Sequence, residues 1–417
     1  MTDVSVGKPE ISYGLARNTF EWADLSLKVV VDRITEDGKS ELYFYHTNTA
    51  GTVLLHMGQA NLLSSTMQSQ FMKSLSSRGP EIDWQTVLTY IARDTIAHLR
   101  EGEPVVWLDE KYGKKPPAYL LPPFFIKNAA NIIYADRSSA KTLFITLIDL
   151  ALSLPWYTNE IGLNITPQDY HKVLYLDWEG SAEIMGWQKE CIRRGMNIEI
   201  CDIPYLHCSR SLADDISHIQ HKVEEVKADV VIIDSLGMAV GDDLNLTKPA
   251  FNFFAALRHL PVTPLIVAHT AKGINTWKRT VYGNAYYENE ARSIWELKKR
   301  QDTNSPELTL TMHHRKPPPF APTHEPIAFL FTFDGNRITV ESATASPDTL
   351  DDNKRTVEDK ILNVLMNTEK RLSQAEIIHE SKEGLKDTSV AKTLQRMLKK
   401  KDPEIMKDNN GNYFFVY

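Results

Sequence analysis

The segment from Asn131 to Leu152 constrains the fold of this chain most strongly. An apolar run, Asn131–Ala135, leads into a short polar loop, and a second apolar run, Leu143–Leu152, follows it. This pattern predicts a buried strand, a tight loop and a helix that opens at Lys141-Thr142. The first turn of a helix presents free backbone N–H groups and the positive end of the helix dipole. The loop is therefore a candidate binding site for an anion such as a phosphate.

The loop resembles the P-loop of nucleotide triphosphatases, G-x-x-x-x-G-K-[ST], with Ala135 and Ala140 at the two glycine positions. It is also similar to the loop of the minichromosome maintenance helicases, in which alanine precedes the lysine. The resemblance implies that Lys141 contacts the β- and γ-phosphates of ATP and that Thr142 binds Mg²⁺. It implies a nucleotide-binding set of Ala135, Asp136, Arg137, Ser138, Ser139, Ala140, Lys141, Thr142 and Leu143. We expect Ala140 to be tolerated if its φ angle is negative. The alternative is a chance match on a buried strand–helix unit.

A second buried strand, starting at His171, ends in the acidic stretch Asp177-Trp-Glu179. Strands that are apolar on both faces are typical of parallel sheets covered by helices. In RecA-like ATPases the corresponding strand ends in a glutamate that polarises the attacking water, and Glu179 matches that place. The alternative is that Asp177 and Glu179 only cap the helix predicted over Ser181–Arg194.

Two further apolar strands also end in polar residues. The stretch Ala228–Ser235 resembles a Walker B motif, which implies that Asp234 binds Mg²⁺ together with Thr142 and that Ser235 orients its neighbours. The strand from Pro264 ends at His269, which matches the position that senses the γ-phosphate in RecA-like ATPases. The alternative for His269 is a hydrogen-bonded histidine without a catalytic role.

The stretch Arg279–Leu297, with Ala-Arg292-Ser-Ile-Trp-Glu-Leu at its end, resembles the RecA-like branch related to RepA, the hexameric replicative helicase of plasmids. The strands 293–299, 307–314 and 326–333 are expected to extend the sheet in the antiparallel sense. The resemblance implies a ring-shaped homo-oligomer in which Arg292, Arg315 or Lys316 enters the nucleotide site of the next subunit. The alternative is that all three are solvated surface charges.

The expected fold is α/β, with a RecA-like P-loop core that has a mostly parallel sheet. We expect an N-terminal α+β module over 1–110, a linker over 111–123, the core over 124–343, a linker over 344–355 and a winged helix over 356–417. The last region reads as three helices and a hairpin at Asn-Gly. Its third helix would enter the major groove of DNA, and its exposed basic residues are Lys392, Arg396, Lys399 and Lys400. The alternative is a winged helix that contacts protein.

A net charge of −7 excludes a uniformly basic nucleic-acid binder. Residues 354–417, however, hold 13 Lys and Arg against 10 Asp and Glu, so DNA, more than RNA, is expected to bind there. The longest apolar run, 143–156, contains Asp149 and is too short to span a membrane. The first residues lack the apolar stretch of a secretory leader, and three cysteines without metal spacing fit a reducing cytoplasm.

These features together predict an ATP-hydrolysing motor that acts on nucleic acid, helicase-like or DNA-remodelling. One alternative is a degenerate P-loop protein that hydrolyses little ATP and acts as a DNA-binding regulator or protein-loading switch. Another is an ATPase that loads or regulates other proteins without unwinding DNA.

Overall fold

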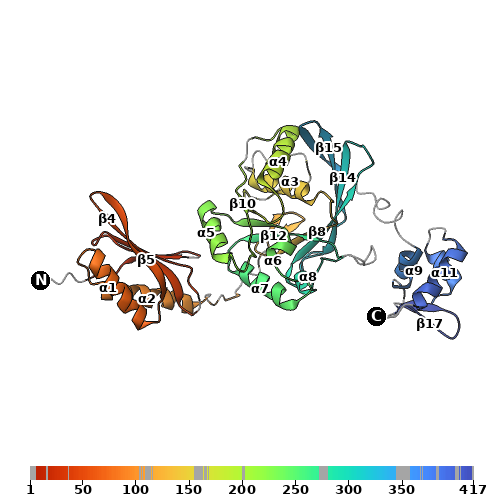
Figure 1. Ribbon diagram of the computed structural model, residues 1–417. Helices are drawn as coiled ribbons and strands as arrows, with labels where there is room; N and C mark the ends of the chain where they lie inside the picture. Colours follow the sequence, from red (N-terminus) through yellow and green to blue (C-terminus); the bar gives the residue numbers. More distant parts are fainter. Residues whose placement is uncertain are drawn as a thin grey trace.

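The computed structural model describes residues 6–15, 17–35, 37–102, 105, 107, 108, 114, 116–154, 163, 167, 169–199, 202–271, 280–343, 357–366, 368, 370–381, 385–399, 403 and 405–415. Lys400 lies outside the described residues. The helices and strands of the described part form three units along the chain (Figure 1).

The first unit is an antiparallel sheet in chain order, covered on one face by two helices. Its strands are β1 (Glu10–Tyr13), β2 (Arg17–Trp22), β3 (Leu27–Asp32), β4 (Lys39–Asn48) and β5 (Gly51–Asn61), and its helices are α1 (Ser65–Arg78) and α2 (Trp84–Glu101). Alternate residues such as Phe20, Trp22 and Val29 are buried, as strict alternation along a half-buried strand requires. A turn that contains Gly38 joins β3 to β4, which pair as a hairpin.

The second unit is built on a nine-stranded sheet in the order β10-β9-β11-β12-β8-β13-β14-β15-β16. The parallel strands are β8 (Asn131–Ala135), β9 (Val173–Asp177), β10 (Tyr205–His207), β11 (Val230–Asp234), β12 (Thr263–His269) and β13 (Ser293–Arg300). Every residue of β8, β9 and β11 is buried, which confirms the mostly parallel α/β sheet expected from their apolar runs.

The sheet continues through three antiparallel strands, β14 (Glu307–Lys316), β15 (Ile327–Asp334) and β16 (Arg337–Ala343). The antiparallel expectation is correct for β14 and β15. It is wrong for β13, which pairs in parallel with β8 and is antiparallel only to β14. The chain reaches β13 through the short helix α8 (Tyr286–Glu290), so β13 enters the sheet at the same end as β8.

Helices cover both faces of this sheet (Figure 1). On one face lie α3 (Lys141–Ser153) and α4 (Ala182–Met196); on the other lie α5 (Ile216–Val226), α6 (Leu236–Val240), α7 (Thr247–Arg258) and α8. The two-stranded sheet of β6 (Tyr119–Leu121) and β7 (Phe125–Ile126) falls partly in the stretch expected as a linker. It buries Leu120 and Leu121 in the core. Among the described helices, none combines the length and apolar character needed to cross a membrane.

The third unit consists of α9 (Val357–Met366), α10 (Gln374–Glu380), α11 (Asp387–Leu398) and the hairpin β17 (Ile405–Lys407) and β18 (Tyr413–Phe415). Ser373 and Glu376 form a capping box at the start of α10. Leu372, just before α10, exchanges two backbone hydrogen bonds with Tyr413, of 2.9 and 2.8 Å. This bridge adds a third short strand segment to the hairpin and ties it to the helices.

Candidate nucleotide site

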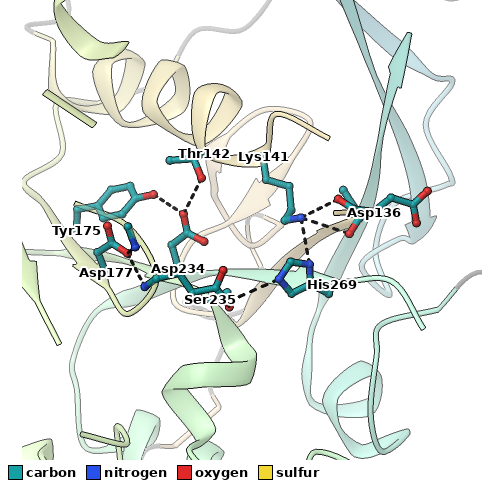
Figure 2. Close-up of polar contacts among 11 residues, drawn as sticks. Asp136, Lys141, Thr142, Tyr175, Asp177, Asp234, Ser235 and His269 are labelled. Atoms are coloured by element: carbon teal, nitrogen blue, oxygen red, sulfur yellow. Dashed lines mark hydrogen bonds and ion pairs between the residues drawn. The ribbon is translucent and has the colours of Figure 1, made fainter. Parts of the chain in front are cut away.

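The residues predicted at the ends of four separate strands meet at one edge of the central sheet. Ala135, Asp177, Asp234 and His269 are the last residues of β8, β9, β11 and β12. The strand register pairs Asp234 with Asp177 and His269 with Ala135. In an open parallel sheet, the carboxyl ends of the strands form the edge at which ligands bind. The helix α3 starts at this edge, directly behind the loop (Figure 2).

The loop between β8 and α3 has two residues in the left-handed region, Ser138 with φ 56° and Ala140 with φ 60°. The condition under which Ala140 was expected to be tolerated, a negative φ, is therefore not met. A residue with a Cβ pays on the order of 1–2 kcal/mol in this conformation, because the Cβ approaches the next carbonyl oxygen. Glycine usually occupies this position of a P-loop. Here Ala140 adopts the left-handed conformation, so its backbone is strained.

Several features of the loop fit a bound phosphate. Ala140 is the N-cap of α3 and has no side chain to bond the first backbone N–H groups of the helix. The Oγ atom of Ser139 is buried and has no hydrogen-bond partner among the described residues. A buried hydroxyl without a partner destabilises the fold. The Ser139 hydroxyl and the first backbone N–H groups of α3 are therefore available to donate to an anion.

The side chain of Lys141 lies inside the loop (Figure 2). Its Nζ donates to the carbonyl oxygen of Asp136 at 2.9 Å and lies 3.3 Å from Nδ1 of His269. Burial lowers the pKa of Lys141, and the nearby carboxylates of Asp234 and Glu179 act in the opposite direction. The amine is therefore held where β- and γ-phosphates would lie if the loop wraps them as a P-loop does.

The predicted metal ligands Thr142 and Asp234 lie next to each other. The Thr142 hydroxyl donates to Oδ2 of Asp234 at 3.3 Å, and the Tyr175 hydroxyl donates to the same oxygen at 2.7 Å. Asp234 is almost fully buried, and burial raises its pKa. A hydroxyl beside a carboxylate offers the oxygen donors that Mg²⁺ prefers, so these two residues fit the ion.

Glu179 lies between Ser235 and His269 at the same edge. The Ser235 hydroxyl donates to its Oε1, and Nε2 of His269 lies 3.7 Å from that oxygen. The proximity of His269, assisted by Ser235 and Lys141, lowers the pKa of Glu179 to about 2. Glu179 does not cap the following helix, because the N-cap is Ser181, whose side chain accepts from the backbone N–H of Ile184.

Asp177 organises the turn that presents Glu179. Its Oδ1 accepts from the backbone N–H groups of Glu179 and Gly180 at 2.9 and 2.8 Å, and its Oδ2 accepts from the Tyr205 hydroxyl at 2.9 Å. The sequence analysis missed both tyrosines, Tyr175 on β9 and Tyr205 on β10. For Tyr175 the available signal was a tyrosine inside an otherwise aliphatic buried strand, because a buried phenol hydroxyl usually finds a polar partner.

The three basic residues expected to act on a phosphate lie at the opposite edge of the sheet. Arg292 directly precedes β13, and its backbone N–H donates to Ala130 at the start of β8. Arg315 pairs with Glu296, which is 1% exposed. The Nζ of Lys316 donates to the carbonyl oxygens of Glu288 and Asn289 at 2.6 and 3.2 Å. None of the three therefore belongs to the site around Lys141 in its own chain.

Three of the four basic residues predicted to bind nucleic acid lie on one exposed face of α11. Lys392, Arg396 and Lys399, together with Gln395, line an open surface depression of about 500 Å³. Arg396 also pairs with Glu358 of α9 at 2.6 Å. Lys400, the fourth predicted residue, falls outside the described part of the chain.

Comparison with known proteins finds a family model that matches the part of the chain containing the loop and the strand ends. A family model described as "AAA domain" matches residues 96–274, fewer than half of the 417 residues. A solved structure of a KaiC-like protein from the hyperthermophilic archaeon Pyrococcus horikoshii OT3 is also similar. The match spans 53% of this chain and 93% of that chain, with 15% identity and a TM-score of 0.35. No curated protein matches the chain. The domain match and the parallel sheet with its strand–loop–helix site support a RecA-like P-loop ATPase core.

Proposed function

We propose that this protein is an ATP-hydrolysing RecA-like motor that acts on nucleic acid, helicase-like or DNA-remodelling. The observation that carries the proposal is the convergence of Lys141, Thr142, Asp234, Glu179 and His269 at one edge of the sheet. These residues come from three strand ends and one helix start. Such a set is what phosphoryl transfer requires, because its catalysis is mainly positioning and charge stabilisation.

Each residue has a role that follows from its contacts. Lys141 supplies positive charge inside the loop, and Thr142 and Asp234 would hold Mg²⁺, which neutralises phosphate charge when bound. A carboxylate with a pKa near 2 accepts protons poorly at neutral pH, so Glu179 orients the attacking water by hydrogen bonding. His269 contacts both Lys141 and Glu179, so it can report a change at the phosphates to the rest of the sheet.

Phosphate release in steady state, with and without DNA, tests the proposal. We expect Glu179→Gln to lower turnover by about 100-fold, the lower end of what a positioned catalytic carboxylate supplies, while ATP binding persists. Glu183→Gln is the matched control, because Glu183 is an exposed glutamate in the first turn of α4. Absence of turnover in both conditions, with no difference between wild type and Glu179→Gln, would contradict the motor.

We also propose that the third unit is a winged helix that binds DNA. The helix order, the hairpin and the Leu372–Tyr413 bridge support this topology. The exposed basic face of α11 offers phosphate contacts. Lys392→Ala with Lys399→Ala should weaken DNA binding and reduce the slope of log affinity against log salt by about 2, about one per lost contact. Lys73→Ala on α1 is the control, and an unchanged slope in the double variant would contradict the assignment.

Arg292, Arg315 and Lys316 lie at the amino edge of the sheet, the edge where β8 and β13 begin. In a ring, basic residues at this edge could contact the nucleotide site of a second copy of the chain. Arg292 is exposed, whereas Arg315 and Lys316 are engaged within their own chain. Arg292 is therefore the residue of the three that is best placed to enter a neighbouring nucleotide site. A protein of this kind would work in the cytoplasm, where ATP and DNA occur together.

A second candidate function is a DNA-binding regulator or protein-loading switch that binds ATP but hydrolyses little of it. The strained φ of 60° at Ala140 favours it, because the strain can limit how closely the loop wraps a triphosphate. Equilibrium binding of Mg-ATP without phosphate release would select this function. Strand displacement on forked DNA would separate unwinding from other ATP-driven work.

A further inference from the structure

Arg137 lies in the loop between β8 and α3, four residues before Lys141. Arg137 is exposed, whereas Ser139 and Lys141 are buried. Within the described part of the chain, the side chain of Arg137 makes no hydrogen bond and no ion pair. Its guanidinium group is therefore available to an anion, and guanidinium groups bind phosphate oxygens through two parallel hydrogen bonds.

The backbone around Arg137 also suits an anion. Residues 137 and 138 form a turn, and φ is positive at Ser138 and Ala140 but not at Arg137 or Ser139. Turns of this kind direct successive backbone N–H groups to one side of the chain, where they form an anion-binding concavity. Arg137 is the first residue of this turn, so its side chain branches from the backbone that would hold a phosphate.

The charge of Arg137 also acts on Lys141. Burial lowers the pKa of Lys141 the most, the carboxylates of Asp234 and Glu179 raise it, and the positive charge of Arg137 lowers it. The two cations are thus near enough to repel each other, which disfavours the charged form of the amine. A phosphate group that contacts both cations would remove this repulsion.

A second arginine at the same edge of the sheet is already engaged. Arg210 follows the end of β10, and its guanidinium group lies 3.7 Å from the carboxylate of Asp215. The carbonyl oxygen of Arg210 accepts from the indole N–H of Trp178 at 2.7 Å, which holds its backbone beside the end of β9. Arg137 is therefore better placed than Arg210 to contact a phosphate at the loop.

We propose that Arg137 is a catalytic residue that contacts the γ-phosphate of the ATP bound to its own chain. In hydrolysis, water adds to the γ-phosphorus and the bond to the β–γ bridging oxygen breaks, which yields ADP, inorganic phosphate and a proton. Arg137 transfers no proton and stabilises the negative charge on the γ-phosphate oxygens. The inference rests on the ATP hydrolysis proposed above and assigns this charge to the same chain, with or without a ring.

Phosphate release by the full chain tests the role. Arg137→Ala should lower kcat by about 100-fold with little change in KM, since the loss of one preorganised donor costs 10²–10³ in rate. Arg137→Lys should recover part of the loss, because lysine keeps the charge but not the planar fork. Arg210→Ala is the matched control and should leave turnover unchanged. The melting temperature of Arg137→Ala should equal that of wild type, because the side chain has no partner to lose.

A transition-state analogue gives a readout that a merely structural role would not move. Aluminium fluoride with Mg-ADP mimics the transferring phosphoryl group. Arg137→Ala should weaken its binding by about 100-fold, the same factor as the loss in kcat, because catalysis is differential binding of the transition state. The affinity for Mg-ADP alone should not change. Equal losses for both ligands would overturn the proposal.

Mixing two inactive variants separates action within one chain from action on a neighbour. Copies with Arg137→Ala keep Glu179, and copies with Glu179→Gln keep Arg137. If Arg137 acts on its own chain, no site in the mixture is complete and turnover stays low. Recovery of turnover on mixing would overturn the assignment to the same chain. A wild-type chain that hydrolyses ATP as fast as Arg137→Ala would overturn this inference alone, whereas a wild-type chain without turnover would overturn the motor as well.

Discussion

The carboxyl edge and the amino edge of the central sheet carry different chemistry on the same strands. At the carboxyl edge, Asp177, Asp234 and His269 end three strands beside Lys141. At the amino edge, Arg292 directly precedes β13, and Arg315 lies near the end of β14. β8 has five residues, so the edges are separated by roughly 16 Å at about 3.3 Å per residue. An arginine side chain does not span that distance, so the basic edge does not reach the loop of its own chain.

The two edges therefore differ in charge. The carboxyl edge gathers acidic side chains, and within one chain its positive charge comes from Lys141, from Arg137 in the same loop and from the helix start. In the ring proposed above, the amino edge of a neighbour would supply additional positive charge. The direction of the strands, rather than any single residue, separates the acidic edge from the basic edge.

The largest effect is expected when the positive charge at the carboxyl edge is removed. Lys141→Ala should reduce turnover by about a thousandfold, since removing one preorganised donor costs 10²–10³ in rate. Phosphate release and ATP titration measure the effect. Arg292→Ala, at the other edge, should leave the ATP affinity of a dilute single chain unchanged. Equal losses of affinity in both variants would show that the two edges are not separate.

A substitution at the amino edge should instead change the stability of the fold. Arg315→Ala leaves the carboxylate of Glu296 buried without its charged partner, which should lower the free energy of unfolding by about 3 kcal/mol. Urea unfolding checks this value. The double variant with Glu296→Gln should recover much of the loss. If Arg315→Ala abolishes turnover without destabilising the fold, Arg315 acts on a neighbour's phosphate after all.

A smaller effect is expected from the hydroxyl that holds Asp234. Tyr175→Phe removes the 2.7 Å hydrogen bond and should raise the Mg²⁺ concentration for half-maximal binding about tenfold, as for other residues that orient metal ligands. Mn²⁺ binding followed by electron paramagnetic resonance provides a readout besides activity. Tyr205→Phe is the matched control, because it removes a hydroxyl from Asp177 instead. The same affinity in both variants would exclude the role of Tyr175.

The smallest effect concerns the loop backbone. Ala140→Gly removes the Cβ at φ 60° and should stabilise the protein by about 1 kcal/mol. The greater conformational entropy of glycine in the unfolded chain offsets part of this gain. Thermal unfolding measures it. Ala135→Gly is the comparison, because Ala135 lies within a buried strand, where glycine should destabilise. Stabilisation by both variants would mean that the left-handed turn is not the source of strain.

The sequence predicted the parallel sheet and most of the carboxyl edge because those features are local. When buried strands are parallel, a polar residue at the end of each strand lies at the carboxyl edge of the sheet, which is why Asp177, Asp234 and His269 could be named together. The sequence did not predict the parallel pairing of β13, nor the φ of Ala140, because neither follows from a periodic pattern.

Contacts between residues of distant strands follow only from the tertiary structure. The hydrogen bond of Tyr175 to Asp234 joins residues 59 positions apart, and the pairing of Glu179 with His269 depends on the strand order β9-β11-β12. The place of Arg292 opposite the loop likewise follows from the end at which β13 enters the sheet. Sequence periodicity fixes which face a side chain occupies, whereas register and strand order, which are set by packing across the whole core, fix what it meets there.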